Sequence, residues 1–142
     1  MTAARLDLVA WRHTAFGGVL DPQDFIEEGF LRTGWTADLQ IRAAPGDTAT
    51  GGGLPVDLTT ATPPAQGMSG TVDAAYANTN GTTGATIWRP YITKATMEAM
   101  PTNADKSQPI VLWYDLTISA PSSAGSIVIA FGTFTVMPGV GF

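Results

Sequence analysis

The chain has 142 residues, no cysteine, a charged fraction of 13% and a net charge of −5. Without cysteine there is no disulfide and no zinc site built on sulfur. The seven Lys and Arg residues are too few and too scattered for a nucleic-acid-binding surface, because phosphate binding needs clustered positive charge. The length predicts one domain that spans residues 1–142. No apolar run approaches the length of a membrane span, and the first residues lack the apolar core of a signal peptide, so we expect a protein made in the cytoplasm.

The first part of the chain predicts short strands and one ambiguous segment. Residues 5–11 predict a strand with Leu6 and Leu8 on one face. Residues 15–20 predict a second strand. Residues 24–31 fit either a short capped helix or a strand.

The clearest early strand is residues 34–42, where apolar and polar side chains alternate. Trp35, Leu39 and Ile41 share one face, and polar residues occupy the other. We therefore expect this face to point into the core.

Residues 43–84 have a different composition and predict a loop-rich, insertion-like region. They contain half of the 16 glycines and no Lys or Arg. The strands expected in or just after this region are short and weak, at 56–59, 70–75 and 85–88.

Such a region is a candidate docking surface. A segment that buries little apolar surface in its own domain gains little to offset the conformational entropy that it loses on ordering, so that entropy must be offset by contacts with another molecule. We therefore expect its loops, including Gly51, Gly52 and Gly53, to contact a partner, with the N-terminal arm around Leu6 and Leu8 as a second contact.

Residues 93–100 predict the one helix of the fold. Thr93 can act as its N-cap and Pro101 ends it. It has barely two turns, so we expect it to depend on packing and to close one end of a β-sandwich.

Residues 109–136 predict a long hairpin around which the domain is organised. The first strand alternates, and its expected core residues are Ile110, Leu112, Tyr114, Leu116 and Ile118. The second strand is apolar on both faces, which predicts a central or doubly covered strand. Its core face would change sides at Gly132, so we expect a β-bulge at Gly132–Thr133.

No set of residues indicates catalysis. His13 is the only histidine, and no Gly-x-Ser-x-Gly motif accompanies it. The densest carboxylate group predicts a solvated acidic turn, with weak calcium binding or glycoside hydrolysis as alternatives; its members are Asp21, Asp24, Glu27 and Glu28. We therefore expect no catalytic residue, no metal and no cofactor.

Two tryptophans are candidates for contact with a partner. Trp113 lies on the strand face opposite Leu112 and Tyr114, so it points away from the expected core. Trp88 is a second candidate, either in an interface or as part of a sugar-stacking platform.

Several short motifs occur along the chain in a recognisable arrangement. They are Leu6-Asp-Leu-Val9, Gly34-Trp-Thr-Ala-Asp-Leu-Gln-Ile-Arg42, the helical segment 93–100, Tyr114-Asp-Leu116 and Gly132-Thr-Phe-Thr-Val-Met-Pro-Gly-Val140. Together they resemble a group of small bacteriophage structural domains, the N-terminal β-sandwich of upper-baseplate and tail-fibre adaptor proteins. A further motif, Pro55–Thr59, follows the Gly34 strand here, whereas it usually precedes that strand in the family.

The strand pattern and the resemblance together predict an all-β fold. It is an immunoglobulin-like or jelly-roll-like antiparallel β-sandwich with one short helix. The resemblance implies a non-enzymatic accessory protein of the virion that docks on other virion proteins, as a tail or baseplate adaptor or on the capsid surface, and that forms homo-oligomers within the particle. The alternatives are a capsid cement protein, which stabilises contacts between capsid subunits, and a carbohydrate-binding module for adsorption. Neither nucleic acid nor membrane is an expected partner.

Overall fold

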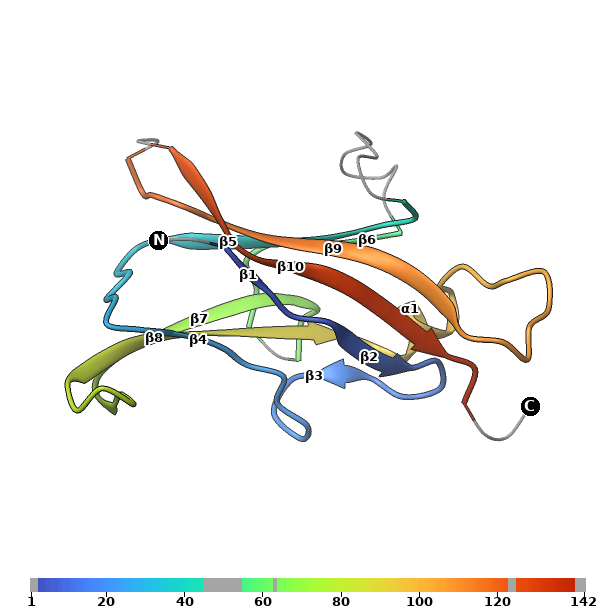
Figure 1. Ribbon diagram of the computed structural model, residues 1–142, viewed down its shortest axis with the longest axis horizontal. Coiled ribbons are helices and arrows are strands. Elements are labelled where there is room, and N and C mark those ends of the chain that lie inside the picture. Colours follow the sequence, from blue (N-terminus) through green and yellow to red (C-terminus); the bar gives the residue numbers. More distant parts are fainter. Residues whose placement is uncertain (1–2, 45–54, 63, 123–124, 140–142) are drawn as a thin grey trace.

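Two β-sheets packed face to face form the structure, which is a β-sandwich with one short helix, as the sequence predicted (Figure 1). The computed structural model describes residues 3–44, 55–62, 64–122 and 125–139. Gly51, Gly52 and Gly53 lie outside the described residues.

The larger sheet has the C-terminal hairpin at its centre. Strand β10 pairs with β9 on one side and with β1 and β2 on the other, and β9 continues to β5 and β6. The strands are β1 (Ala4–Arg5), β2 (Leu8–Trp11), β5 (Thr36–Arg42), β6 (Val56–Leu58), β9 (Ile110–Ser119) and β10 (Ser126–Met137). Both β1 and β2 run parallel to β10, so this edge of an otherwise antiparallel sandwich is parallel.

The smaller sheet is built around one long strand, β8. Strand β7 pairs along one side of β8, and β3 and β4 pair along the other. The strands are β3 (Phe16–Gly17), β4 (Phe25–Glu28), β7 (Gly67–Ala77) and β8 (Thr83–Ile92). The ambiguous segment 24–31 is therefore a strand at its centre, with Phe25 and Glu27 pointing inward.

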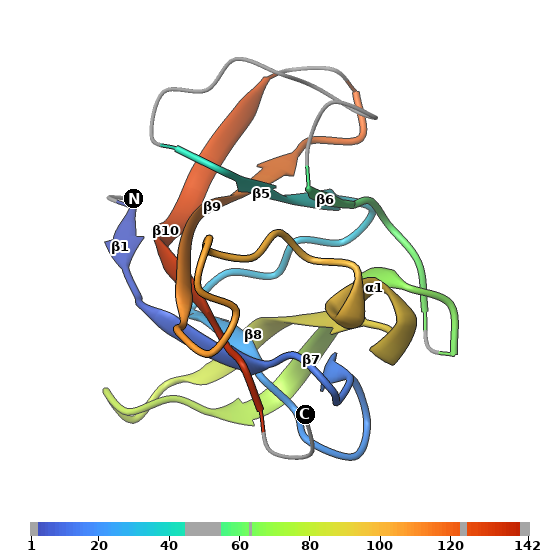
Figure 2. The same ribbon diagram turned by 90° about the vertical axis from the view of Figure 1, so that its right-hand side faces the viewer.

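Helix α1 (Lys94–Glu98) lies between β8 and β9 in the chain and beside the gap between the two sheets (Figure 2). Thr93 is its N-cap, and the Thr93 side chain accepts a hydrogen bond from the main-chain N–H of Thr96. Met97 and Met100 are buried in the core. The helix thus closes one end of the sandwich, as expected.

The core lies between the sheets and follows the predicted alternation closely. Strand β9 buries Leu112, Tyr114, Leu116 and Ile118, and β5 buries Ala37, Leu39 and Ile41. Phe134 of β10 packs edge-on against Phe16 of β3, with ring centroids 5.0 Å apart, and so joins the two sheets.

The predicted bulge in β10 is in the wrong place. The ladder with β9 is unbroken from Ala130 to Val136, through Gly132 and Thr133. The irregularity lies between Val128 and Ala130, where Ile129 is the extra residue. This shift puts Ala130 and Phe134 on the core face and leaves Phe131 on the outer one.

Glycine is required at position 132 by the N-terminal segment beside it, and not by a bulge. A Cβ atom at Gly132 would lie 2.3 Å from the main-chain oxygen of Leu6. Glycine therefore allows the chain between β1 and β2 to run in close contact beside β10.

The expectation that residues 43–84 bury little of their own apolar surface is wrong for the described part. Val56, Leu58 and Met68 are core residues, and β7 is longer than predicted. Of the short, weak strands expected in or just after this region, two are edge strands, since β6 ends the larger sheet and β7 ends the smaller one. The third is not, because residues 85–88 belong to β8, the long central strand of the smaller sheet.

Candidate interaction surface

The outer face of the larger sheet carries exposed apolar side chains on β2, β9 and β10. Strand alternation produces this face, because the neighbours of each core residue point away from the core. The exposed fractions are 56% for Val9, 49% for Trp11, 48% for Val111 and 39% for Phe131. Together with the half-buried Trp113 and Met137, these residues are called the apolar sheet face below.

The strand register arranges this face in rows that cross three strands. One row is Val9, Thr135 and Val111. Another is Arg5, Phe131 and Asp115. Monomeric proteins rarely leave a large contiguous apolar patch in water, and such patches mark sites of protein contact.

Charged residues border the apolar sheet face on both sides. On the β1 side, the Arg5 guanidinium lies 5.9 Å from the ring centroid of Trp113 and 3.4 Å from the Asp7 carboxylate. On the β9 side, the Arg42 guanidinium lies 3.6 Å from the Asp115 carboxylate. The combination of an apolar centre and a charged rim is typical of protein–protein interfaces.

A pair of carboxylates lies beyond this rim, on β5 and β6. Asp57 is paired with Gln40, so it is diagonal to Asp38 on the same outer face. One oxygen of each carboxylate is buried with no hydrogen-bond partner in the described part of the chain. Burial and the neighbouring Asp57 raise the pKa of Asp38 to about 7, so Asp38 is partly protonated near neutral pH.

Of the two tryptophans that the sequence proposed as contacts, only Trp113 lies on this surface. Trp88 is 2% exposed and packs in the core. Its indole N–H donates to a carboxylate oxygen of Glu27 at 3.3 Å. Trp88 therefore offers no surface to a partner or to a sugar.

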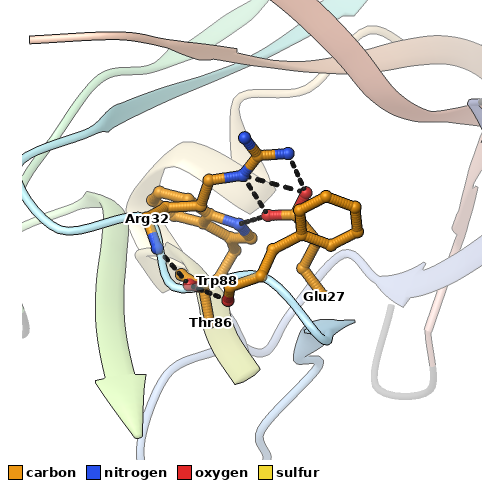
Figure 3. A network of polar contacts seen from close by, with 5 residues as sticks. Glu27, Arg32, Thr86 and Trp88 are labelled. Atoms are coloured by element: carbon orange, nitrogen blue, oxygen red, sulfur yellow. Dashed lines mark hydrogen bonds and ion pairs between the residues drawn. The ribbon is translucent and has the colours of Figure 1, made fainter. Parts of the chain in front are cut away.

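Glu27 belongs to a buried polar network rather than to a solvated acidic turn (Figure 3). Arg32 donates to it through Nη2 at 2.8 Å and through Nε at 3.2 Å. The Arg32 guanidinium is also 4.5 Å from the ring centroids of both Phe30 and Trp35. The Thr86 hydroxyl accepts from the Arg32 main-chain N–H and donates to the Phe30 carbonyl. This network fixes the segment between β4 and β5 over the smaller sheet.

The other candidate carboxylates and His13 do not converge on a common site. Asp24 pairs with Arg89 at 2.8 Å, and Glu28 accepts two hydrogen bonds from Thr79. His13 Nδ1 lies 3.1 Å from a carboxylate oxygen of Glu98 on α1. These pairings are structural, and none places an acid, a base and a nucleophile together.

Leu6 and Leu8, the candidate contacts of the N-terminal arm, differ in position. Leu6 lies between β1 and β2 and is exposed, and its carbonyl accepts a hydrogen bond from the Tyr114 hydroxyl. Leu8 is partly buried and packs against the core, so it offers less surface to a partner than Leu6 does.

Two pockets lie elsewhere on the molecule. One, of about 570 Å³, is lined by Val19, Leu20, Tyr91 and other residues beside β3. The other, of about 180 Å³, lies between β1 and β4, where Leu6 and Ile26 are among its walls. Asp21 lines the first pocket, and Asp24 and Glu27 line the second, where both carboxylates are already held in ion pairs with Arg89 and Arg32.

Within the described ranges, no group of three or more His, Asp or Glu side chains is placed to hold a metal ion. The helix in that part of the chain is too short to cross a membrane.

The sequence reasoning selected Trp113 but missed most of the surface around it. The available signal was the second strand of the hairpin, which is apolar on both faces. That pattern suggested a central or doubly covered strand. Strand β10 is central, between β9 and the strands β1 and β2, but its outer face is open at Phe131.

Comparisons of the chain with protein-family models, with curated proteins and with solved structures gave no match.

Proposed function

We propose that this protein is a non-enzymatic structural component of a bacteriophage particle, made in the host cytoplasm, which docks on other virion proteins. The observation that carries the proposal is the apolar sheet face around Trp113, where Val9, Trp11 and Val111 are about half exposed. Burial of such side chains against another protein is favourable by about 25 cal/mol per Å² of apolar surface. A rigid sheet presents them without any rearrangement of the backbone.

The resemblance of the sequence motifs to adaptor domains supports the same reading and supplies the virion setting. A tail or baseplate adaptor and a capsid-surface or cement protein remain the two locations to distinguish. A carbohydrate-binding role has less support, because Trp88, on which it depended, is buried.

The test compares two matched variants in particle binding. Val111→Asp places a charge in the apolar sheet face, and Ile26→Asp places the same charge at a position of similar exposure, 44%, on the outer face of the smaller sheet. Both should fold, since the replaced side chains point outward. Particles that lack the protein should bind Ile26→Asp like the parent and Val111→Asp at least ten-fold more weakly.

Equal binding of the two variants would overturn the assignment of this face. Cross-linking or electron microscopy of intact particles would then locate the protein on the tail or the capsid. Absence of the protein from particles would overturn the proposed function itself.

A further inference from the structure

The apolar sheet face is self-complementary across its three strands. Strand β10 runs along the middle, with β1 and β2 on one side and β9 on the other (Figure 1). Each row therefore begins on the β1–β2 side and ends on β9. A two-fold rotation about an axis along β10 would place each row on the same row of a second copy, in reverse order.

This reversal brings compatible side chains together. In the row Arg5, Phe131 and Asp115, each arginine meets the carboxylate of the other copy, and the two phenylalanine rings meet at the axis. In the row Val9, Thr135 and Val111, each Val9 meets a Val111. Opposite charges and apolar side chains are thus matched by the register alone.

The row between them combines polar and aromatic side chains. Asp7 lies beside Thr133, whose main-chain N–H donates to the Asp7 carboxylate at 3.0 Å, and Thr133 is paired with Trp113. In the reversed row, Asp7 and Thr133 lie opposite Trp113 of the other copy.

We infer that the partner at this face is a second copy of this chain, and that the two copies pack their larger sheets face to face about a two-fold axis along β10. The inference rests on the proposed docking role of the face and names its occupant. Face-to-face sheets pack about 10 Å apart with strands within about 30° of each other. The arrangement is closed, so it gives dimers and not fibres.

The decisive experiment exchanges charges between the two copies. Sedimentation should find the parent chain of 14.8 kDa as a dimer. The variants Arg5→Glu and Asp115→Lys should each shift toward monomer, because each places like charges together twice. A mixture of the two variants should form a heterodimer, since Glu from one then meets Lys from the other, and the remaining Arg5 meets the remaining Asp115.

Two controls separate the possible outcomes. Val111→Asp should abolish the dimer, and Ile26→Asp should leave it unchanged. Thermal unfolding should show that every variant is folded. The two-fold arrangement would be overturned if the parent were monomeric at all concentrations. It would also be overturned if the Arg5→Glu and Asp115→Lys variants formed no heterodimer on mixing.

The same variants distinguish this inference from the proposed function. If the parent is monomeric but Val111→Asp still fails to bind particles, the self-pairing fails and the docking role stands. If the charge exchange succeeds but the protein is absent from particles, the self-pairing stands and the proposed function fails.

Discussion

The phenolic hydroxyl of Tyr114 donates a hydrogen bond of 2.6 Å to the main-chain carbonyl of Leu6, 108 residues earlier in the chain. Tyr114 is buried in the centre of β9, and its register partner on β10 is Gly132. The bond therefore ties the segment between β1 and β2 to the core. It passes beside Gly132, which has no side chain to block it. Burial raises the pKa of Tyr114 well above its ordinary value, with the Asp7 carboxylate adding to the effect, so the hydroxyl remains a donor at all ordinary pH.

Tyr114→Phe should lower the free energy of unfolding by about 1–2 kcal/mol, because it leaves the Leu6 carbonyl without its partner. Urea denaturation measures this loss. Tyr91→Phe is the control, since no hydrogen bond of the Tyr91 hydroxyl is found among the described residues, and it should change stability by less than about 0.5 kcal/mol. Equal effects of the two changes would contradict the role given to the Tyr114 bond.

Glu27→Ala should lower the free energy of unfolding by about 3–5 kcal/mol, because it leaves the charge of Arg32 buried without a counter-ion. Glu28→Ala, on the outward face of the same strand, should cost about 1 kcal/mol or less. The double variant Glu27→Leu with Arg32→Met should be less destabilised than Glu27→Leu alone. A double variant that is no better than the single one would show that the charge of Arg32 is not the cause.

The parts of the fold that follow from local pattern were predictable from the sequence. The period of two in residues 110–119 gives the core face of β9, and the N-cap Thr93 gives the start of α1. Both depend on near neighbours along the chain. The burial of Glu27 depends instead on a distant partner, Trp88, which is 61 residues away in the chain. No local pattern distinguishes a buried carboxylate from a solvated one.

The candidate site was only partly predictable for the same reason. Trp113 could be assigned to the outer face from the alternation of its own strand. Its neighbours Val9 and Phe131 come from distant segments, and their position depends on the bulge at Ile129 and on the parallel pairing of β2 with β10. Neither feature leaves a local signal, so the surface emerges only from the assembled sheet.

Arg12 and His13 should differ sharply in their contribution to stability, although they are adjacent. The Arg12 guanidinium donates to the carbonyls of Met100 and Pro101, at 2.6 and 2.7 Å, just beyond the end of α1. His13 makes an exposed pair with Glu98.

Arg12→Ala should therefore cost about 1.5–3 kcal/mol, because these carbonyls lose a charged donor. His13→Ala should cost at most about 1 kcal/mol, as exposed ion pairs do. Denaturation of the two variants under one set of conditions tests the contrast. A larger loss in His13→Ala than in Arg12→Ala would refute it.

The carboxylate of Asp38 should make the protein less stable as pH rises toward neutrality. Its pKa is about 7 in the folded protein, against an ordinary value of 3.8 that applies to the unfolded chain. The folded state thus binds the proton more tightly, and its contribution to stability is full below about pH 4 and is lost as pH rises through 7. Asp38→Asn removes the titrating group while keeping the shape of the side chain, so the variant should gain stability relative to the parent between pH 4 and pH 8.

Asp105→Asn is a control for which stability should change with pH in the opposite direction. Hydrogen bonds from Ser107 lower the pKa of Asp105, so this variant should lose stability relative to the parent as pH rises through about 4. Urea denaturation of all three proteins from about pH 2 to about pH 8 measures both differences. A difference between Asp38→Asn and the parent that stays constant with pH would show that Asp38 is ionised in the folded protein.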